Sequence, residues 1–166
     1  MQAQRLLKEY RDHKKERAKE GKDNIHLFPL QNDITKWIAI IQGPPDCPYE
    51  GGHFAVRFEV PSSYPLQPPK ARFETKIFHA NIHPKTGEVC LDILKTAWSP
   101  AWTLQSVCRA IVALLASPEP DSPLNCDAGN LLRMNDDRGH NSMAKMYTAL
   151  YATSAQIEAV RAKEGS

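Results

Sequence analysis

Residues 64–94 read YPLQPPKARFETKIFHANIHPKTGEVCLDIL, and the regular alternation of side chains ends inside this stretch. Residues 70–75 still fit a strand, but residues 76–101 contain no long periodic element. Residues that break helices and strands interrupt them: Pro84, Gly87 and Pro100. Loops of more than about 20 residues are uncommon in compact domains and are usually functional. The sequence therefore predicts a long functional loop that contains Cys90.

The part of the chain before this loop alternates between strand patterns and turn residues. Residues 25–30, 36–43 and 53–60 are rich in β-branched and aromatic side chains. Clusters of Pro, Gly, Asn and Asp separate them. Together with residues 70–75, they predict an antiparallel meander of four strands. A charged segment with an apolar stripe predicts a first helix from Gln4 to about Lys19.

Helical spacing returns after the loop. Apolar residues recur with a helical period from Leu104 to Leu115, and Cys108 lies on that stripe as a core residue. A short helix is predicted from Asp127 to Arg133, and a last helix from Asn141–Ser142 to about Val160. The predicted buried face of the last helix comprises Met143, Met146, Tyr147, Leu150 and Tyr151. The order of elements predicts one α+β domain over residues 1–166.

Composition limits the class of protein. The chain has 166 residues, of which 42% are hydrophobic and 24% charged, as in a globular domain. No apolar run approaches the ~18 residues of a membrane span, and the charged N-terminus is no secretory signal. The net charge is +2, but residues 1–22 carry eight Lys or Arg against four Asp or Glu. We expect a cytosolic protein, or one bound to a membrane from that side, whose basic first helix meets acidic partners or forms a solvated face.

The four cysteines are at positions 47, 90, 108 and 126, and none forms a C-x-x-C pair. This spacing argues against a redox motif of the thioredoxin kind and against a zinc ribbon. Cys90 is then either a buried filler or a nucleophile. No histidine neighbours it in sequence, which argues against a cysteine protease, because histidine usually activates the thiol there. We assign no function to Cys47.

The loop stretch is followed by WSP at 98–100, preceded by GPPDCPYEGGHF at 43–54, and followed later by DSPLN at 121–125. In this order and spacing, these motifs resemble the ubiquitin-conjugating enzyme family over roughly residues 3–152. The resemblance implies an N-terminal helix, a four-stranded antiparallel sheet, an active-site loop and C-terminal helices. It also implies that Cys90 carries ubiquitin as a thioester, with no cofactor and no metal, because ATP is used by the upstream activating enzyme.

Thioester relay explains why Cys90 needs no adjacent histidine. A thioester is already activated, and a thiol with the ordinary pKa of about 8.5 is partly ionised at neutral pH. By resemblance, Asn81 either donates to the oxyanion or braces the loop, although Ala80 replaces the proline of the family motif. By the same resemblance, Asp92 helps to orient or deprotonate the acceptor; the alternative is that it caps a turn.

Two further positions carry roles by resemblance. Ser122 occupies the gate position beside the active site, where a neutral residue suggests relaxed acceptor choice that includes cysteine. His79 is the structural histidine of the family motif. A zinc site at His79 and His83 is the alternative, but no cysteine pair at finger spacing supports it.

Partner surfaces also follow from the resemblance. The expected contacts with the activating enzyme and a RING-type ligase are Arg5, Lys8, Leu66, Ser99, Pro100 and Ala101. The exposed face of the helix from Leu104 to Ala116 and the loop near Leu124 are expected to support the donor ubiquitin, with Leu104 and Leu124 as contact residues.

The segments PDSPLNCDAGNLLR at 120–133 and RGHNSMAKMYT at 138–148 resemble the peroxisomal branch of the family. The resemblance implies peroxisomal RING-type ligases, an import receptor as substrate, and a membrane-anchored tether of the peroxin-22 type that holds the enzyme at the cytosolic face of the peroxisome. Cys126 belongs to this signature and is either a redox partner of Cys90 or a thiol without function. The alternatives are a ubiquitin-like modifier, a general cytosolic role, or a non-catalytic binding module. The basic helix alone does not indicate a nucleic-acid partner.

Overall fold

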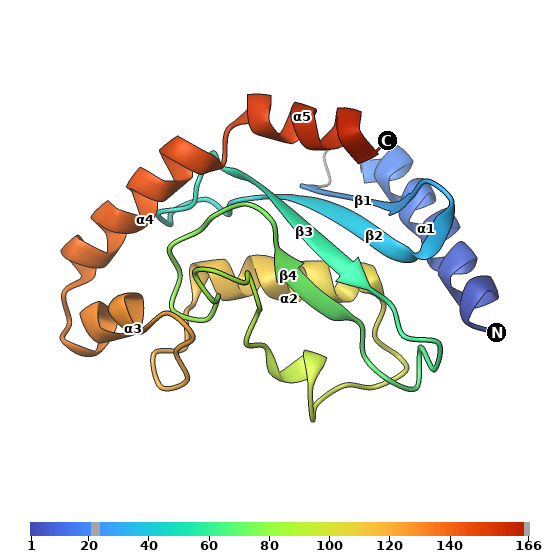
Figure 1. The fold of residues 1–166 in the computed structure, drawn as a ribbon, viewed down its shortest axis with the longest axis horizontal. Helices are drawn as coiled ribbons and strands as arrows, with labels where there is room; N and C mark the ends of the chain where they lie inside the picture. Colours follow the sequence, from blue (N-terminus) through green and yellow to red (C-terminus); the bar gives the residue numbers. More distant parts are fainter. Residues whose placement is uncertain (21–23, 165–166) are drawn as a thin grey trace.

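The computed structural model describes residues 1–20 and 24–164 as one α+β unit (Figure 1). Helix α1 leads into four strands, a short 3-10 helix follows in the loop, and four helices close the chain. Their bounds are α1 Gln2–Glu20, β1 Ile25–Leu30, β2 Asp33–Gln42, β3 His53–Glu59, β4 Lys70–Phe73, η1 Asp92–Leu94, α2 Leu104–Ala116, α3 Cys126–Arg133, α4 Asp137–Tyr151 and α5 Ser154–Glu164. The predicted fold class and antiparallel meander are confirmed, because the strands pair in the order β1-β2-β3-β4.

The central strand β2 is apolar on both faces, because the sheet is covered on both sides. Trp37, Ala39 and Ile41 point into the main core with α2, where all three are buried. Ile38 and Ile40 point to the opposite face and pack with Ile157 of α5. Figure 1 shows α2 along one side of the sheet and α5 along the other. This second covered face explains why the strand lacks a clean apolar-polar alternation.

Helix α2 forms where the apolar period predicts it. The Thr103 hydroxyl accepts a hydrogen bond from the backbone N–H of Ser106 and so caps its start. The side chain of Cys108 is fully buried, as expected of a core residue. The helix lies against the inner face of β1 and β2, and its first turn is adjacent to the end of the long loop.

The prediction of one last helix from 141 to 160 is wrong. The chain instead forms α4 and α5, which are separated at Ala152 and Thr153. The backbone N–H of His53 donates to the carbonyl of Ala152, and the hydroxyl of Thr153 accepts from the N–H of Gln156. The Gln156 side chain accepts in turn from the N–H of Thr153, which completes a capping box. Helix α4 also begins earlier than predicted, because Asp136 caps it by accepting from Gly139.

The predicted buried face of the last helix is also partly wrong. The buried residues of α4 are His140, Ala144 and Thr148. Met146 and Leu150 are 45% and 56% exposed and lie on the outer side of the helix. Met143, Tyr147 and Tyr151 are half-buried, so the apolar stripe is rotated from the predicted one. Within residues 1–20 and 24–164, no helix combines the length and apolarity that a membrane crossing requires.

Candidate functional site

The long loop between β4 and α2 is attached to the core at several backbone positions. The Tyr49 hydroxyl donates to the carbonyl of Phe78 at 2.6 Å. The backbone N–H of Phe73 donates to the carbonyl of Gly87 at 2.8 Å, which continues the edge of the sheet into the loop. Gly87 has φ +75°, and a Cβ there would lie 2.0 Å from the Phe73 oxygen, so only glycine fits this approach. The loop is therefore a fixed platform.

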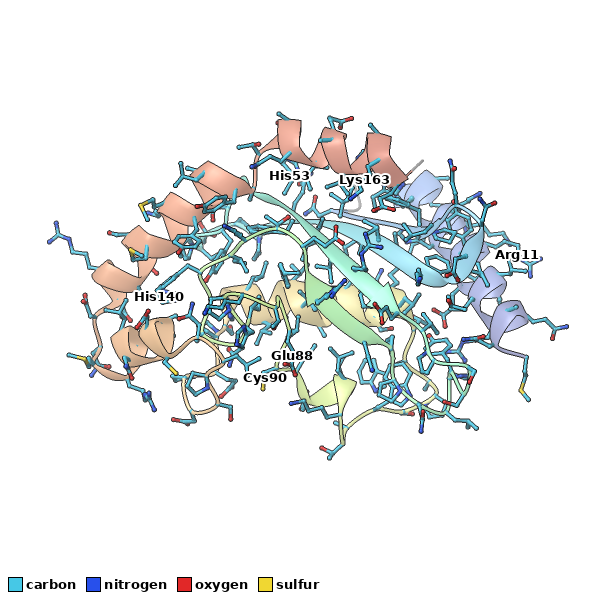
Figure 2. All side chains as sticks on the ribbon, viewed as in Figure 1. Arg11, His53, Glu88, Cys90, His140 and Lys163 are labelled. Atoms are coloured by element: carbon cyan, nitrogen blue, oxygen red, sulfur yellow. The ribbon has the colours of Figure 1, made fainter. Side chains whose placement is uncertain are left out.

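Cys90 lies on this platform with a free, half-buried thiol. Its backbone N–H donates to the carbonyl of Asn81 at 2.8 Å, and a bridge between Ile82 and Val89 supports the same pairing. Figure 2 shows Cys90 beside Glu88 on the side of the molecule opposite to His53 and α5. Among the described residues, no hydrogen bond or ion pair reaches the sulfur. The surroundings thus hold the backbone of Cys90 and leave its thiol free.

The Asn81 side chain is buried, and both of its polar ends are occupied. Its Nδ2 donates to the carbonyls of Glu119 and Ser122, at 2.8 and 3.3 Å. Its Oδ1 accepts from the backbone N–H of Glu119 at 2.8 Å. Of the two roles expected for Asn81, this geometry favours bracing, because the amide joins the Cys90 loop to the segment that follows α2. Glu119 contributes only backbone groups, so no side-chain pattern could have identified it.

His79 is fully buried between the loop and α2. Its Nε2 donates to the carbonyl of Leu114 at 2.9 Å, and its Nδ1 accepts from the backbone N–H of Asn81 at 3.0 Å. Burial lowers the pKa of His79 to about 4, so the ring is neutral and ties the loop to α2. With both nitrogens occupied, His79 has no free position for zinc. His83 instead accepts from the N–H groups of Lys85 and Thr86.

The two other expected catalytic side chains are exposed. Asp92 begins the 3-10 helix η1, where its carboxylate accepts from the backbone N–H of Ile93 at 2.8 Å. Ser122 is brought beside Asn81 through its carbonyl, while its side chain faces solvent. Asp92 follows Cys90 by two residues, and the Ser122 carbonyl is bonded to Asn81, whose own carbonyl accepts from the N–H of Cys90. One carboxylate oxygen of Asp92 therefore stabilises the turn, as expected of a cap. The other oxygen has no hydrogen bond within the described residues.

Cys126 opens helix α3 with an exposed, free thiol. The backbone N–H groups of Leu124 and Asn125 both donate to the carbonyl of Ala80. Since Cys90 is bonded to the next residue, Asn81, the segments that carry the two thiols are attached to adjacent residues of the loop. The two cysteines are thus brought into one region without a bond between them.

Arg5 lies against the turn before α2. Its Nη2 donates to the carbonyls of Pro100 and Trp102, both at 2.9 Å, and its Nε pairs with Glu9 at 2.7 Å. Leu66, which is 75% exposed, lies in the segment whose Pro65 carbonyl accepts from the indole of Trp98. The structure thus brings together the start of α1, the Leu66 segment and the 99–102 turn. Lys8 is exposed on the same helix.

Glu9 was not identified from the sequence, although it connects this surface to the core. It is 8% exposed, accepts from the Tyr64 hydroxyl at 2.6 Å, and accepts from the backbone N–H of Leu104 at 3.0 Å. Burial and the hydrogen bond to Glu9 raise the pKa of Tyr64. Arg5 and Glu9 have the spacing of an ion pair on a helix, and this spacing was the signal in the sequence that could have identified Glu9.

Leu104 cannot contact a donor ubiquitin directly, because its side chain is fully buried. This expectation is corrected: Leu104 is the first core residue of α2. Leu124 is half-buried in the loop before α3. The exposed positions of α2 are Arg109, Ala113 and Ala116.

A cavity of about 410 Å³ lies between β4 and the loop. Glu88 and Val89 before Cys90, and Leu94 and Lys95 after it, contribute to its lining, together with Arg72 from β4. Cys90 itself does not line the cavity. The hollow is therefore beside the thiol rather than around it.

This arrangement suits a particular kind of chemistry. A free thiol on a rigid loop, with no base bonded to it in the described structure, can exchange with an acyl group that arrives already activated. Cleavage of an unactivated amide would need a base bonded to the thiol, and the described residues place none there.

Comparisons with known proteins agree with this chemistry. A family model described as ubiquitin-conjugating enzyme matches residues 5–148. The chain is 64% identical over 148 residues to "Protein PEROXIN-4" of Arabidopsis thaliana, which covers 89% of this chain and 93% of that protein. It is 59% identical over 150 residues to "Ubiquitin-conjugating enzyme E2 pex4" of Dictyostelium discoideum, with 90% and 98% covered. The crystal structure of H. polymorpha Pex4p with the soluble domain of Pex22p matches with a TM-score of 0.85 and 40% identity, over 89% of this chain and 96% of that one.

Proposed function

The chain belongs to the ubiquitin-conjugating enzyme family, and from that premise we propose that Cys90 is the residue that carries ubiquitin as a thioester. The observation that supports this assignment is a free, half-buried thiol on a loop whose backbone is bonded to Asn81. Of the three other cysteines, Cys108 is buried in the core. Cys47 donates from its sulfur to the carbonyl of Pro44, and Cys126 lies outside the braced loop.

The reaction has two acyl-transfer steps at the thioester carbonyl. In loading, the Cys90 thiolate attacks the carbonyl carbon of the ubiquitin C-terminus held on the activating enzyme, and the thiolate of that enzyme leaves. In transfer, an acceptor amine or thiol attacks the same carbonyl, loses its proton, and the Cys90 thiolate leaves. Each step exchanges one bond to the acyl carbon for another. No cofactor is required on this chain, because the acyl group is activated before it arrives.

Asn81 and His79 are proposed to act by holding the loop. Each connects the Cys90 segment to a different part of the core, Asn81 to Glu119 and His79 to Leu114. A loop fixed from both sides keeps the thiol in one position for the incoming thioester, and correct placement of reacting atoms lowers the barrier. These two residues are therefore positioning residues in this proposal.

Asp92 and Ser122 are proposed to act on the acceptor. Asp92 keeps an oxygen that can accept a proton or a hydrogen bond from a lysine amine, whose ordinary pKa is about 10.4. Ser122 offers a neutral hydroxyl, which favours neither a charged amine nor a thiol. Discharge of loaded enzyme onto free cysteine and free lysine tests this point. Comparable rates would support relaxed acceptor choice, and a strong preference for lysine would exclude it.

The partner surface is proposed to be the one formed by the start of α1, Leu66 and residues 99–101. Arg5 holds the turn in place, while Lys8 and Leu66 are exposed for direct contact with the activating enzyme and a RING-type ligase. Leu124 and the exposed residues of α2 are proposed to support the donor ubiquitin.

A peroxisomal role is proposed from the relatives. Two of them carry peroxin-4 names, and the matched crystal structure contains the soluble domain of Pex22p. We expect a Pex22-like tether to hold this chain at the peroxisomal membrane, where it modifies import receptors with peroxisomal ligases. Co-purification with the soluble domain of such a tether tests the partner. Failure to bind it would favour a general cytosolic role.

Oxidation of Cys90 with Cys126 is a separate proposal about the same thiol. Peroxide would oxidise one thiol to a sulfenic acid, and attack by the second thiolate would form the disulfide and release hydroxide. The oxidised enzyme would lose loading, and a reducing agent would restore it. Identical peroxide sensitivity of the Cys126→Ser variant would exclude this pair.

The central assignment is tested by loading. Incubation with ubiquitin, activating enzyme and ATP should give an adduct that a thiol reagent removes. The Cys90→Ala variant should give none, while Cys47→Ala, the matched control in a turn away from the loop, should load normally. An adduct that persists in Cys90→Ala would refute the assignment.

A further inference from the structure

A small polar cavity lies where the end of α1, the sheet and α5 meet. Its volume is about 120 Å³, which is room for about four water molecules. Four basic side chains from four different elements line it: Arg17 of α1, His26 of β1, His53 of β3 and Arg161 of α5. Figure 2 shows His53 beneath α5, far from Cys90. The cavity is therefore separate from the site described above.

The positive charge in this cavity is poorly balanced. Among its described lining residues, Glu158 is the one carboxylate, and its side chain is 72% exposed. It lies 3.9 Å from Nε of Arg161, which is too far for a hydrogen bond. No ion pair joins Arg17 to a carboxylate within the described part of the chain. Two guanidinium groups thus face the cavity with one weak counter-charge.

Two polar atoms of the lining residues also lack partners. The Nδ1 of His26 and the Nε of Arg161 are both buried from solvent, and neither has a hydrogen-bond partner within the described residues. A buried polar group without a partner costs about 1–3 kcal/mol relative to a satisfied one. Such groups usually indicate a water or ion that completes their hydrogen bonds.

The pKa of His26 also indicates an excess of positive charge in the cavity. Its pKa is lowered to about 4, first by burial and then by the charges of Arg17, Arg161 and His13. Among the described residues, no carboxylate offsets the effect of these cations on the ring. The remaining lining groups are neutral and polar, or apolar on the floor of the cavity: Asn24, Gln42, Ser154, Ile40 and Ile157.

We propose that this cavity binds an oxyanion of the phosphate class, held by Arg17 and Arg161 with His26 and His53 as further donors. The guanidinium group presents several donors in a plane and matches phosphate oxygens better than any other side chain. A phosphate group fits within a cavity of about 120 Å³ and presents mainly hydrogen-bond acceptors. Free phosphate and a phospholipid headgroup share this chemistry.

An anion in this position would link α1 to α5, which Ile157 and the ion pair of Arg57 with Glu164 already hold on the sheet. Helix α5 has one buried residue, Ile157, and its partners in the cavity come from α1 and the sheet. Bound phosphate would bridge Arg17 to Arg161 and hold α5 on the sheet. A ligand that binds only the folded state also raises its stability with concentration. The inference does not depend on the role proposed for Cys90.

The first experiment titrates the full chain with inorganic phosphate at constant ionic strength, with chloride as the matched salt. NMR spectra should show saturable shifts centred on Asn24, His26 and His53. Arg17→Gln and Arg161→Gln should each weaken binding about tenfold or more, the loss expected for one charged hydrogen bond. Arg138→Gln, the same change at an exposed position of α4, should bind like the wild type. Circular dichroism confirms that each variant is folded.

Linear shifts of equal size in all variants would mean non-specific screening and would overturn the proposal. A second arm identifies the source of the phosphate. Wild-type protein is sedimented with phosphatidylcholine vesicles, with and without phosphatidylinositol monophosphate. Binding that needs the phosphorylated lipid and is lost in Arg161→Gln supports a headgroup ligand, and phosphate binding without vesicle binding supports a soluble one. Vesicle binding that persists in Arg161→Gln, with no phosphate binding, contradicts the site.

Discussion

Asn81 and Glu119 are joined by two reciprocal hydrogen bonds, one from the Asn81 Nδ2 to the Glu119 carbonyl and one from the Glu119 N–H to the Asn81 Oδ1, both at 2.8 Å. The amide therefore acts as a substitute for a pair of sheet hydrogen bonds between two loops. These bonds therefore fix the orientation of the Asn81 side chain before any substrate binds.

Replacing Asn81 with alanine should lower stability as well as activity. The change removes the bonds to Glu119 and Ser122 and leaves partly buried backbone groups without these partners, at a cost of about 1–3 kcal/mol in the free energy of unfolding. Loading and transfer should fall together, because both depend on the position of Cys90. Urea denaturation and loading kinetics measure the two effects. Asn130→Ala, at an exposed position on α3, should change neither. Unchanged stability with slow transfer alone would instead indicate an oxyanion donor.

Gly87→Ala should disturb the loop much more than Gly51→Ala. Both glycines have a positive φ, +75° and +79°, so backbone strain costs about 1–2 kcal/mol at either position. Only at Gly87 would the new Cβ also meet the Phe73 carbonyl, whereas the space around Gly51 is open. We expect slow loading of Cys90 for Gly87→Ala and normal loading for Gly51→Ala. Equal loading rates for the two variants would show that the loop can shift to accommodate the new Cβ without affecting Cys90.

The strands, α2 and the loop could be predicted because local patterns determine them. The alternation in β3 and the apolar period of α2 each record one buried face. The break between α4 and α5 was missed because no glycine or proline marks it, although Thr153 and Gln156 have capping-box spacing. Met146 was wrongly predicted as buried, because an apolar stripe does not say which side faces the core.

The residues of the candidate site were likewise predicted only in part. Cys90, His79 and Asn81 stand out in the sequence through their motif, but Glu119 acts through its backbone and Glu9 through burial. Neither property is visible in a single sequence. Leu104 was predicted as a contact residue because its helix borders the site, while its packing, which only the fold determines, places it in the core.

Acid should destabilise the protein through His79. The folded state holds the ring neutral with a pKa of about 4, whereas the unfolded chain binds a proton at about 6.5. The full stability is therefore present above pH 6.5 and falls as the pH decreases toward 4, by up to about 3 kcal/mol from this residue. His26, with a pKa also lowered to about 4, adds a smaller part because it is only half-buried. Urea denaturation from neutral to acid pH measures the slope.

His79→Gln provides the comparison for this slope. Glutamine does not titrate, so the variant should be less stable at neutral pH but lose less stability on acidification. A slope equal to that of the wild type would show that other groups account for the acid sensitivity.

Arg5→Ala should uncouple the ligase surface from Cys90. The variant loses the two bonds to the carbonyls of Pro100 and Trp102, so the turn before α2 is no longer held against α1. Discharge stimulated by a RING-type ligase should fall about tenfold. Discharge onto a free amino acid without ligase should stay near the wild-type rate. Arg11→Ala is the control, because Arg11 lies exposed on the outer side of the same helix (Figure 2). Loss of both activities would indicate general unfolding rather than positioning.

Ile157→Ala should loosen α5 without affecting loading. Ile157 is 4% exposed and is the one buried residue of α5, where it packs with Ile38 and Ile40 of β2. Its truncation should cost about 2–4 kcal/mol, because the removed atoms leave a cavity against the sheet. Hydrogen exchange should rise in α5 and on the outer face of β2. Ala159→Ser, at an exposed position of the same helix, should leave exchange unchanged. Loading of Cys90 should stay normal, because α5 and the loop lie on opposite sides of the molecule, and a loading defect in Ile157→Ala would mean that the two sides are coupled.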